Sequence, residues 1–152
     1  MKELDEIIYD ALCASPQVIA LVGDRIQSTC IEVPPTEDDN TPLPYIIITD
    51  DSLQNEQGTK DSLWESETDR VQASVEIAAG SPHEVKTLRR LIRRAIANYV
   101  ETLDEIPYLQ SVTNDGIAWD WLKPCYYDTL HYQADMGNYL TEDEQEENGS
   151  ES

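Results

Sequence analysis

Few residues in this chain have the types and spacing that catalysis requires. His83 and His131 are the two histidines, and they stand far apart in the sequence. A histidine acts as a general base when a nucleophile and an orienting acid lie within hydrogen-bond reach. No G-x-S-x-G, P-loop, H-E-x-x-H or dinucleotide glycine pattern supplies such a set. We therefore assign neither histidine a role and predict that the protein is not an enzyme.

Metal chemistry has equally weak candidates. Carboxylate pairs bind hard cations when a loop folds around them, but Asp38–Asp39 and Asp50–Asp51 lack EF-hand spacing and are more simply interpreted as solvated acidic surface. The cysteines show no C-x-x-C or Cys/His spacing, and we expect small buried or half-buried hydrophobic residues. They are Cys13, Cys30 and Cys125. We expect neither metal nor cofactor.

The C-terminal third is rich in aromatic residues that could line a ligand groove. They are Trp119, Trp121, Tyr126, Tyr127 and Tyr132. Large rings also bury much area with little lost freedom, so they suit a sheet face or a subunit contact. We favour core or interface over a pocket.

The most distinctive pattern is a cluster of cations in KTLRRLIRRAIANYV, residues 86–100. The chain has 10 Lys and Arg against 31 Asp and Glu, and half of the cations fall within nine consecutive residues. These are Lys86, Arg89, Arg90, Arg93 and Arg94. Their three- and four-residue spacing places them on one ridge of a helix. Residues 81–100 carry one acid, Glu84, and so sum to +4; the formal charge of −21 leaves −25 for the remainder.

Three interpretations of this ridge are open. It is a solvated helix face, a phosphate-binding surface, or a contact with an acidic surface of this chain or of a neighbouring copy. A sequence pI of about 4.1 argues against nucleic acid, because binding to that polymer is driven by cations. Copies carrying so much negative charge repel one another unless an interface pairs basic with acidic patches. A head-to-tail interface of this kind closes into a ring when the rotation fits.

Helical elements are expected at both ends of the first hundred residues. Apolar spacing predicts a helix over about the first thirteen residues, and Ser15–Pro16 begins a short turn that ends at Gly23. A longer helix begins at Ser81 as N-cap with Pro82 next, and its apolar stripe is expected to lie on a sheet. The cations form the opposite ridge.

Strands are expected between and after these helices. The predicted strands are 24–33, YIIITDD from Tyr45 with burial on both faces, 69–78, the front half of 106–122 before a turn at 114–116, and 126–140. Two polar excursions separate them, 34–44 and 53–67. The expected fold class is α+β, with a mainly antiparallel sheet and an N-terminal helix and a long central amphipathic helix on one face.

One domain over 1–140 and an acidic, disordered tail over 141–152 are expected. There is no apolar run of about 18 residues and no leader-like N-terminus, so we expect no membrane partner and a cytoplasm-like compartment.

The order of these segments resembles the tail-completion family of tailed bacteriophages, whose members are often encoded in prophages. The similarity rests on ALVGDRI, PLPYIII, RVQASVEIA and SPHEVKTLRRLIRRAI, and covers about residues 4–100, with a looser match to about 136. Gly23, Arg25 and Ile26 match the family's Gly-x-Arg-Ile, and Pro44 and Tyr45 its Pro-Tyr. We interpret both motifs as fold-forming.

The resemblance implies a structural virion protein that forms a ring, usually a hexamer, at the head-proximal end of the tail. Such a ring terminates the tube and joins it to the head, so the implied partners are further copies, the tail-tube protein and a head-completion or connector protein. It implies assembly in the bacterial cytoplasm and a final place in the virion tail. The alternative is a monomeric α+β adaptor that docks on an acidic protein. Neither function requires sequence-specific nucleic-acid binding.

Overall fold

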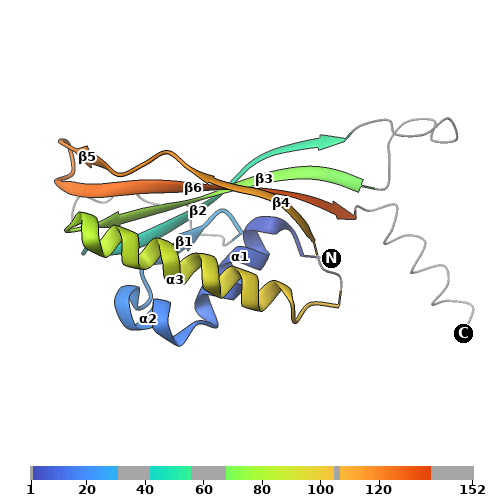
Figure 1. Cartoon of the computed structure of the whole chain (residues 1–152), viewed down its shortest axis with the longest axis horizontal. Coiled ribbons are helices and arrows are strands. Elements are labelled where there is room, and N and C mark those ends of the chain that lie inside the picture. Colours follow the sequence, from blue (N-terminus) through green and yellow to red (C-terminus); the bar gives the residue numbers. More distant parts are fainter. Residues whose placement is uncertain (1, 31–41, 56–67, 105–106, 138–152) are drawn as a thin grey trace, which may run out of the picture.

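The computed structural model describes residues 2–30, 42–55, 68–104 and 107–137 (Figure 1). Three helices lie in these ranges: α1 (Leu4–Cys13), α2 (Pro16–Val22) and α3 (Pro82–Val100). The strands are β1 (Ile26–Ser28), β2 (Tyr45–Asn55), β3 (Thr68–Ala79), β4 (Tyr108–Asn114), β5 (Ala118–Asp120) and β6 (Cys125–Gly137). No helix in this described part is both long and apolar enough to cross a membrane.

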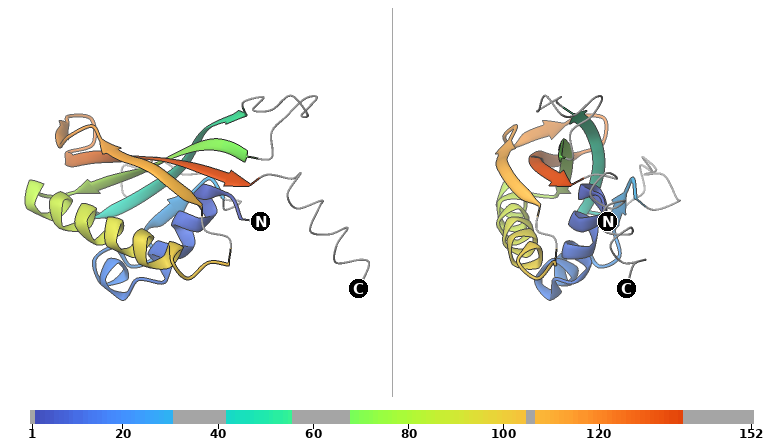
Figure 2. Two further views of the ribbon diagram at one scale, coloured as in Figure 1. Left: turned by 45° about the vertical axis from the view of Figure 1, so that its right-hand side comes forward. Right: turned by 90° about the vertical axis from the view of Figure 1, so that its right-hand side faces the viewer.

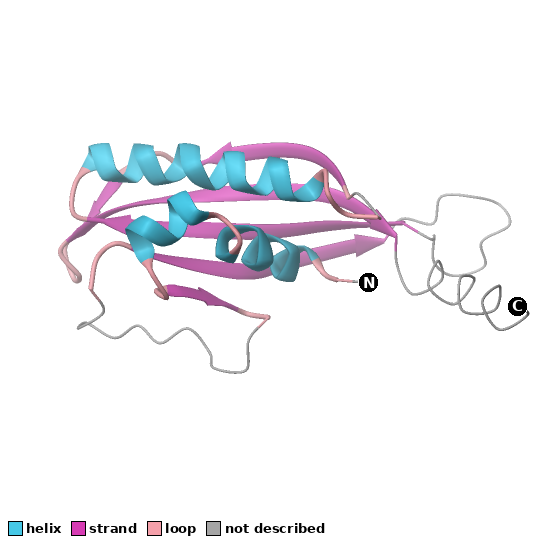
Figure 3. Ribbon diagram, turned by 90° about the horizontal axis from the view of Figure 1, so that it is seen from below, coloured by secondary structure: helices cyan, strands magenta, loops and turns pink. Residues whose placement is uncertain are grey.

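The strands form one sheet in the order β1-β2-β3-β6-β4, with β5 pairing to β6. β1 runs parallel to β2, and the other pairings are antiparallel. All three helices lie against one face of the sheet, and the other face carries none of them (Figures 1 and 3). The predicted α+β class with a mainly antiparallel sheet is confirmed.

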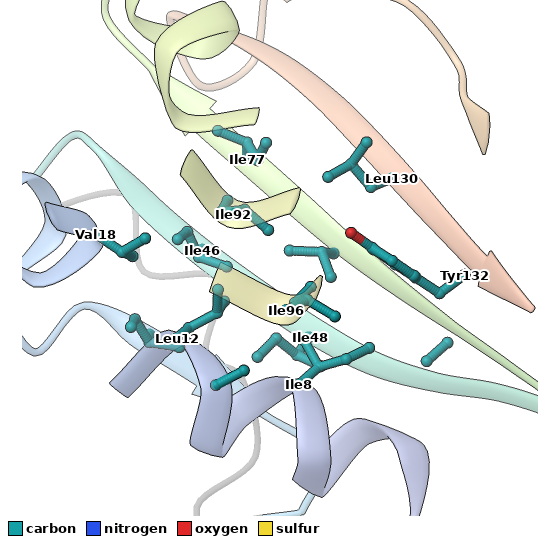
Figure 4. Close-up of a cluster of buried hydrophobic side chains, with 14 of the residues drawn as sticks. Ile8, Leu12, Val18, Ile46, Ile48, Ile77, Ile92, Ile96, Leu130 and Tyr132 are labelled. Atoms are coloured by element: carbon teal, nitrogen blue, oxygen red, sulfur yellow. The ribbon is translucent and has the colours of Figure 1, made fainter. Parts of the chain in front are cut away.

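The core lies between the helices and the face of the sheet that they cover. Ile46 and Ile48 of β2 are fully buried and lie beside Ile8 and Leu12 of α1 (Figure 4). Ile47, between them, is only half-buried because its side chain points to the uncovered face. The prediction that this strand is buried on both faces is therefore wrong. An unbroken isoleucine run was compatible with a two-sided core, but the helices pack on one side only.

Helix α3 begins and packs as its sequence indicates. The Ser81 Oγ accepts a hydrogen bond from the Glu84 N–H at 3.2 Å, and Pro82 occupies the first turn. This cap satisfies one of the donors that a helix start leaves free. The buried side of the helix is Val85, Leu88, Ile92, Ile96 and Val100. The predicted apolar stripe is confirmed.

The N-terminal helices also follow the prediction, whereas the strand after them is shorter. The Ser15 Oγ accepts from the Val18 N–H at 3.4 Å, and α2 ends at Gly23, whose φ of 59° favours glycine. Of the strand expected over 24–33, Ile26–Ser28 is strand among the described residues.

The expectation of buried or half-buried cysteines holds for Cys125 and is wrong for the exposed Cys13 and Cys30.

Several predicted boundaries fall differently or lie outside the described residues. Strand β2 extends through Leu53 to Asn55, so the second excursion begins later than residue 53. Residues 31–41 and 56–67, which hold most of both excursions, and the acidic tail lie outside the described part. The division into a domain over 1–140 and a tail over 141–152 therefore stays a prediction.

Candidate functional site

The two short motifs near the N-terminus meet in space. The Arg25 Nε donates to the Pro44 carbonyl oxygen at 2.9 Å, and Arg25 Nη2 donates to the Leu21 carbonyl at 3.2 Å. The Ile46 N–H donates to the Arg25 carbonyl at 3.0 Å, beside the parallel pairing of Ile26 with Ile46. One arginine thus ties the end of α2 to the entry of β2. This geometry supports a fold-forming role for the two motifs.

The cations of α3 divide into two kinds. Four are exposed: Lys86, Arg90, Arg93 and Arg94. Within the described part of the chain, none of these four forms an ion pair. The fifth, Arg89, has a side chain only 29% exposed and contacts a carboxylate of its own chain.

The partner of Arg89 is Asp128, a wholly buried residue of β6. The Asp128 Oδ2 accepts from Arg89 Nη1 at 2.9 Å and from the Asn114 amide at 3.0 Å. Its Oδ1 accepts from the backbone N–H of Gly116 at 3.0 Å and of Thr129 at 2.8 Å. One carboxylate therefore joins α3, β6 and the turn after β4.

These contacts decide the ionisation of Asp128. Burial by itself would raise the pKa of this carboxyl, because it disfavours the charged form. The hydrogen bonds from Asn114, Arg89, Gly116 and Thr129 outweigh that effect and lower the pKa below its ordinary value. Asp128 is thus a buried anion that neutralises Arg89. The prediction of a five-cation ridge facing outward is wrong at Arg89 and fits the other four.

The exposed cations border a groove of about 520 Å³ between α3 and β4. Figure 2 shows that helix and that strand side by side. All five cations of α3 line the groove, and its apolar lining comes from Ile96, Ala97, Leu109, Val112 and Tyr132. Ile96 and Tyr132 are buried, whereas Leu109 and Val112 are half-buried. The site therefore combines a cationic rim with an apolar floor.

Tyr132 forms part of that floor in its neutral state. Burial raises the pKa of its phenol to about 12, although the nearby positive charge of Arg93 acts in the opposite direction. The floor therefore stays uncharged at neutral pH. A partner that fills the groove must supply apolar groups as well as anions.

The aromatic residues do not gather into one site. Tyr132 is in the core beneath α3, whereas Trp119 packs edge-on against Tyr126 at 4.7 Å between ring centroids. Trp121 and Leu122, in the turn between β5 and β6, are 85% and 95% exposed. The prediction that these aromatic residues lie in the core or an interface fits Tyr132, which is in the core. Trp121 and Leu122 instead form a small exposed apolar tip in the turn between β5 and β6.

The remaining candidates lie apart. His83 is exposed on α3, which covers one face of the sheet, and His131 points to the other face, where its Nε2 lies 3.0 Å from the Asp115 Oδ1. The Asp51 Oδ1 accepts from the Ser74 hydroxyl at 3.1 Å. Asp38 and Asp39 lie outside the described residues. Within the described part, no group of three or more His, Cys, Asp or Glu could hold a metal ion.

Sequence reasoning missed Asp128 and the apolar floor. Asp128 occupies a buried-face position in β6, two residues before Leu130 and four before Tyr132. A charged residue at an apolar position of an alternating strand was the available signal, because such a residue requires a buried partner. The floor had no comparable signal, since Leu109 and Val112 are close to α3 only through the pairing of β4 with β6.

Comparison with known proteins assigns this architecture to a family. The family model described as tail completion protein gp17 matches residues 6–114. The match covers most of the chain and confirms the resemblance drawn from residues 4–100. No curated protein matches the chain. The chain belongs to the tail completion protein gp17 family and is a structural component of a bacteriophage tail.

Proposed function

We propose that this protein assembles head-to-tail into a ring at the head-proximal end of the tail, where it terminates the tube and joins it to the head. Membership of the tail-completion family supports a role in the tail. The observation that carries self-assembly is the set of four exposed cations on α3, each without an ion pair among the described residues, in a chain of net charge −21. A second copy of this acidic chain offers anionic surface that complements such a rim.

The same proposal covers the other expectations from the family resemblance. The ring is a hexamer, it contacts the tail-tube protein on one side and a connector protein on the other, and it assembles in the host cytoplasm. Its function needs no catalysis. The net negative charge suits a ring through which DNA passes, because acidic walls do not retain a polyanion. A ring structure with the α3 arginines in the bore would contradict that last point.

Charge reversal on the rim tests the assembly. We expect purified wild-type protein to form rings at high concentration, or on tail tubes, as seen by sedimentation and electron microscopy. The triple variant Arg90, Arg93 and Arg94→Glu should remain monomeric, because each interface then repels. Arg89 is left intact because it pairs with Asp128. The matched triple variant with Lys at the same positions keeps the charge and should still assemble.

Circular dichroism and urea unfolding of the Glu variant would show that the fold is retained. Rings formed by that variant as readily as by wild type would contradict the interface. Wild-type protein that stays monomeric even with tail tubes, and binds an acidic protein instead, would support the adaptor alternative.

A further inference from the structure

The groove between α3 and β4 has chemistry that selects among acidic partners. Its rim extends along α3 from Lys86 to Arg94, which are eight helical steps and so about 12 Å apart. Its floor is apolar at Leu109, Val112 and Tyr132. A purely acidic surface would pair with the cations of the rim but would leave the apolar floor exposed to water. The better occupant is a segment with apolar residues next to a dense run of acids.

The chain contains such a segment directly after β6. Residues 138–147 read NYLTEDEQEE, in which Tyr139 and Leu140 precede five acids within six residues. An extended stretch from Glu142 to Glu147 spans about 17 Å, which is comparable with the cationic rim. Other acidic runs carry fewer acids, with three each in TEDD at 36–39 and ESETD at 65–69.

We propose that the α3–β4 groove of one subunit binds residues 138–147 of the neighbouring subunit. The acids lie along the exposed cations, and Tyr139 and Leu140 cover the apolar floor. The inference rests on the proposed self-assembly and names the acidic surface that the rim meets. It makes the C-terminal segment the link between adjacent subunits.

Chain length favours the neighbour's segment over the subunit's own. Val112 pairs with Tyr132, five residues before Gly137 and thus about 17 Å back along β6. Leu140 follows Gly137 by three residues, which extend at most about 10 Å and must also reverse direction. A subunit's own Tyr139 and Leu140 therefore fall short of the middle of its groove. A segment from a neighbour has no such limit.

Complementary charge variants test the link in the full-length chain. One variant carries Arg90, Arg93 and Arg94→Glu, and the other carries Glu144, Glu146 and Glu147→Lys. Each alone should fail to associate in sedimentation, because its groove and its segment then carry the same sign. An equimolar mixture should associate, since each groove meets a segment of opposite charge. A control with exposed Asp24, Glu101 and Asp104→Lys changes the net charge equally and should associate like wild type.

A labelled peptide with the sequence of residues 138–152 gives a second readout that needs no ring. We expect it to bind wild-type protein in fluorescence anisotropy and to bind the Glu-reversed groove at least about tenfold more weakly. A peptide with Tyr139 and Leu140→Ser should also bind more weakly, because the floor then stays uncovered.

The outcomes separate this inference from the proposed function. Normal association of the Glu144, Glu146 and Glu147→Lys variant, or equal binding of the peptide to wild-type and reversed grooves, would overturn the segment as partner while leaving ring formation intact. A mixture that stays dissociated would show pairing within one subunit and would also overturn the inference. Peptide binding to the groove without any wild-type assembly would support the recognition and contradict the ring.

Discussion

Arg89 and Arg93 lie one turn apart on the same helix, yet they differ in exposure and in ion pairing. Arg89 reaches the buried Asp128 at 2.9 Å, whereas Arg93 is exposed and forms no ion pair with a described residue. An exposed charge remains hydrated and contributes little to folding. A buried carboxylate depends on its partner, because water is no longer there to solvate it.

The cations that remain available to another molecule are therefore the exposed ones, not Arg89. We expect that reversing Arg89 perturbs the monomer, whereas reversing its exposed neighbours changes the surface alone.

The largest effect on folding is expected at Asp128. The substitution Asp128→Ala removes the acceptor for Arg89, Asn114 and two backbone N–H groups. Loss of one partner from a buried pair costs about 3–5 kcal/mol. Urea unfolding should show a decrease of this order. The control Asp115→Ala should change little, because Asp115 follows β4 directly and its side chain is exposed. A small effect at Asp128 would mean that the pair is not structural.

Arg89→Ala should destabilise the monomer by about 1–3 kcal/mol, because it leaves a buried acceptor with fewer donors. Part of the arginine side chain is exposed, so water can replace some of the interaction. Arg93→Ala is the matched control on the next turn. Equal urea midpoints for the two variants would remove the distinction between them.

Acid should weaken wild-type protein through Asp128. Its folded-state pKa is lowered, so the unfolded chain takes up the proton first, near an ordinary pKa of about 3.9. The stabilisation is therefore present above that value and is lost as the pH falls toward the folded-state pKa. We expect the stability difference between wild type and Asp128→Asn to shrink between pH 6 and pH 3, as measured by urea unfolding. A constant difference would contradict a lowered pKa.

The smallest folding effect is expected at the exposed rim. Arg90, Arg93 and Arg94→Ala should each change the free energy of unfolding by about 0.5 kcal/mol or less. Raising the salt from 0.1 to 1 M shortens the screening length from about 10 to 3 Å, so it should weaken association of the wild type. If these Ala substitutions lowered the free energy of unfolding well beyond that value, the cations would also support the fold.

The architecture was predictable where one residue pattern sufficed. The cap at Ser81, the stripe through Leu88 and Ile92, and the alternation of β3 each followed from local spacing. The isoleucine run of β2 misled because the number of covered faces depends on where helices pack. Asp128 was readable as a charged residue at a buried position, yet its partner on α3 is 39 residues away.

The candidate site was half predictable for the same reason. Helical periodicity gathered the cations on α3, and composition showed that they oppose the charge of the chain. It could not show that Leu109 and Val112 lie beside them, because the pairing of β4 with β6 creates that proximity.

By itself, the sequence determined the α+β class, the starts of the helices, the family and the excess of negative charge, since each depends on local pattern or on composition. Only the tertiary structure decided that Arg89 is a structural residue and that the other cations border an apolar groove. Contacts between distant segments set burial, and burial determines whether a charge is satisfied within the subunit or is left for a partner.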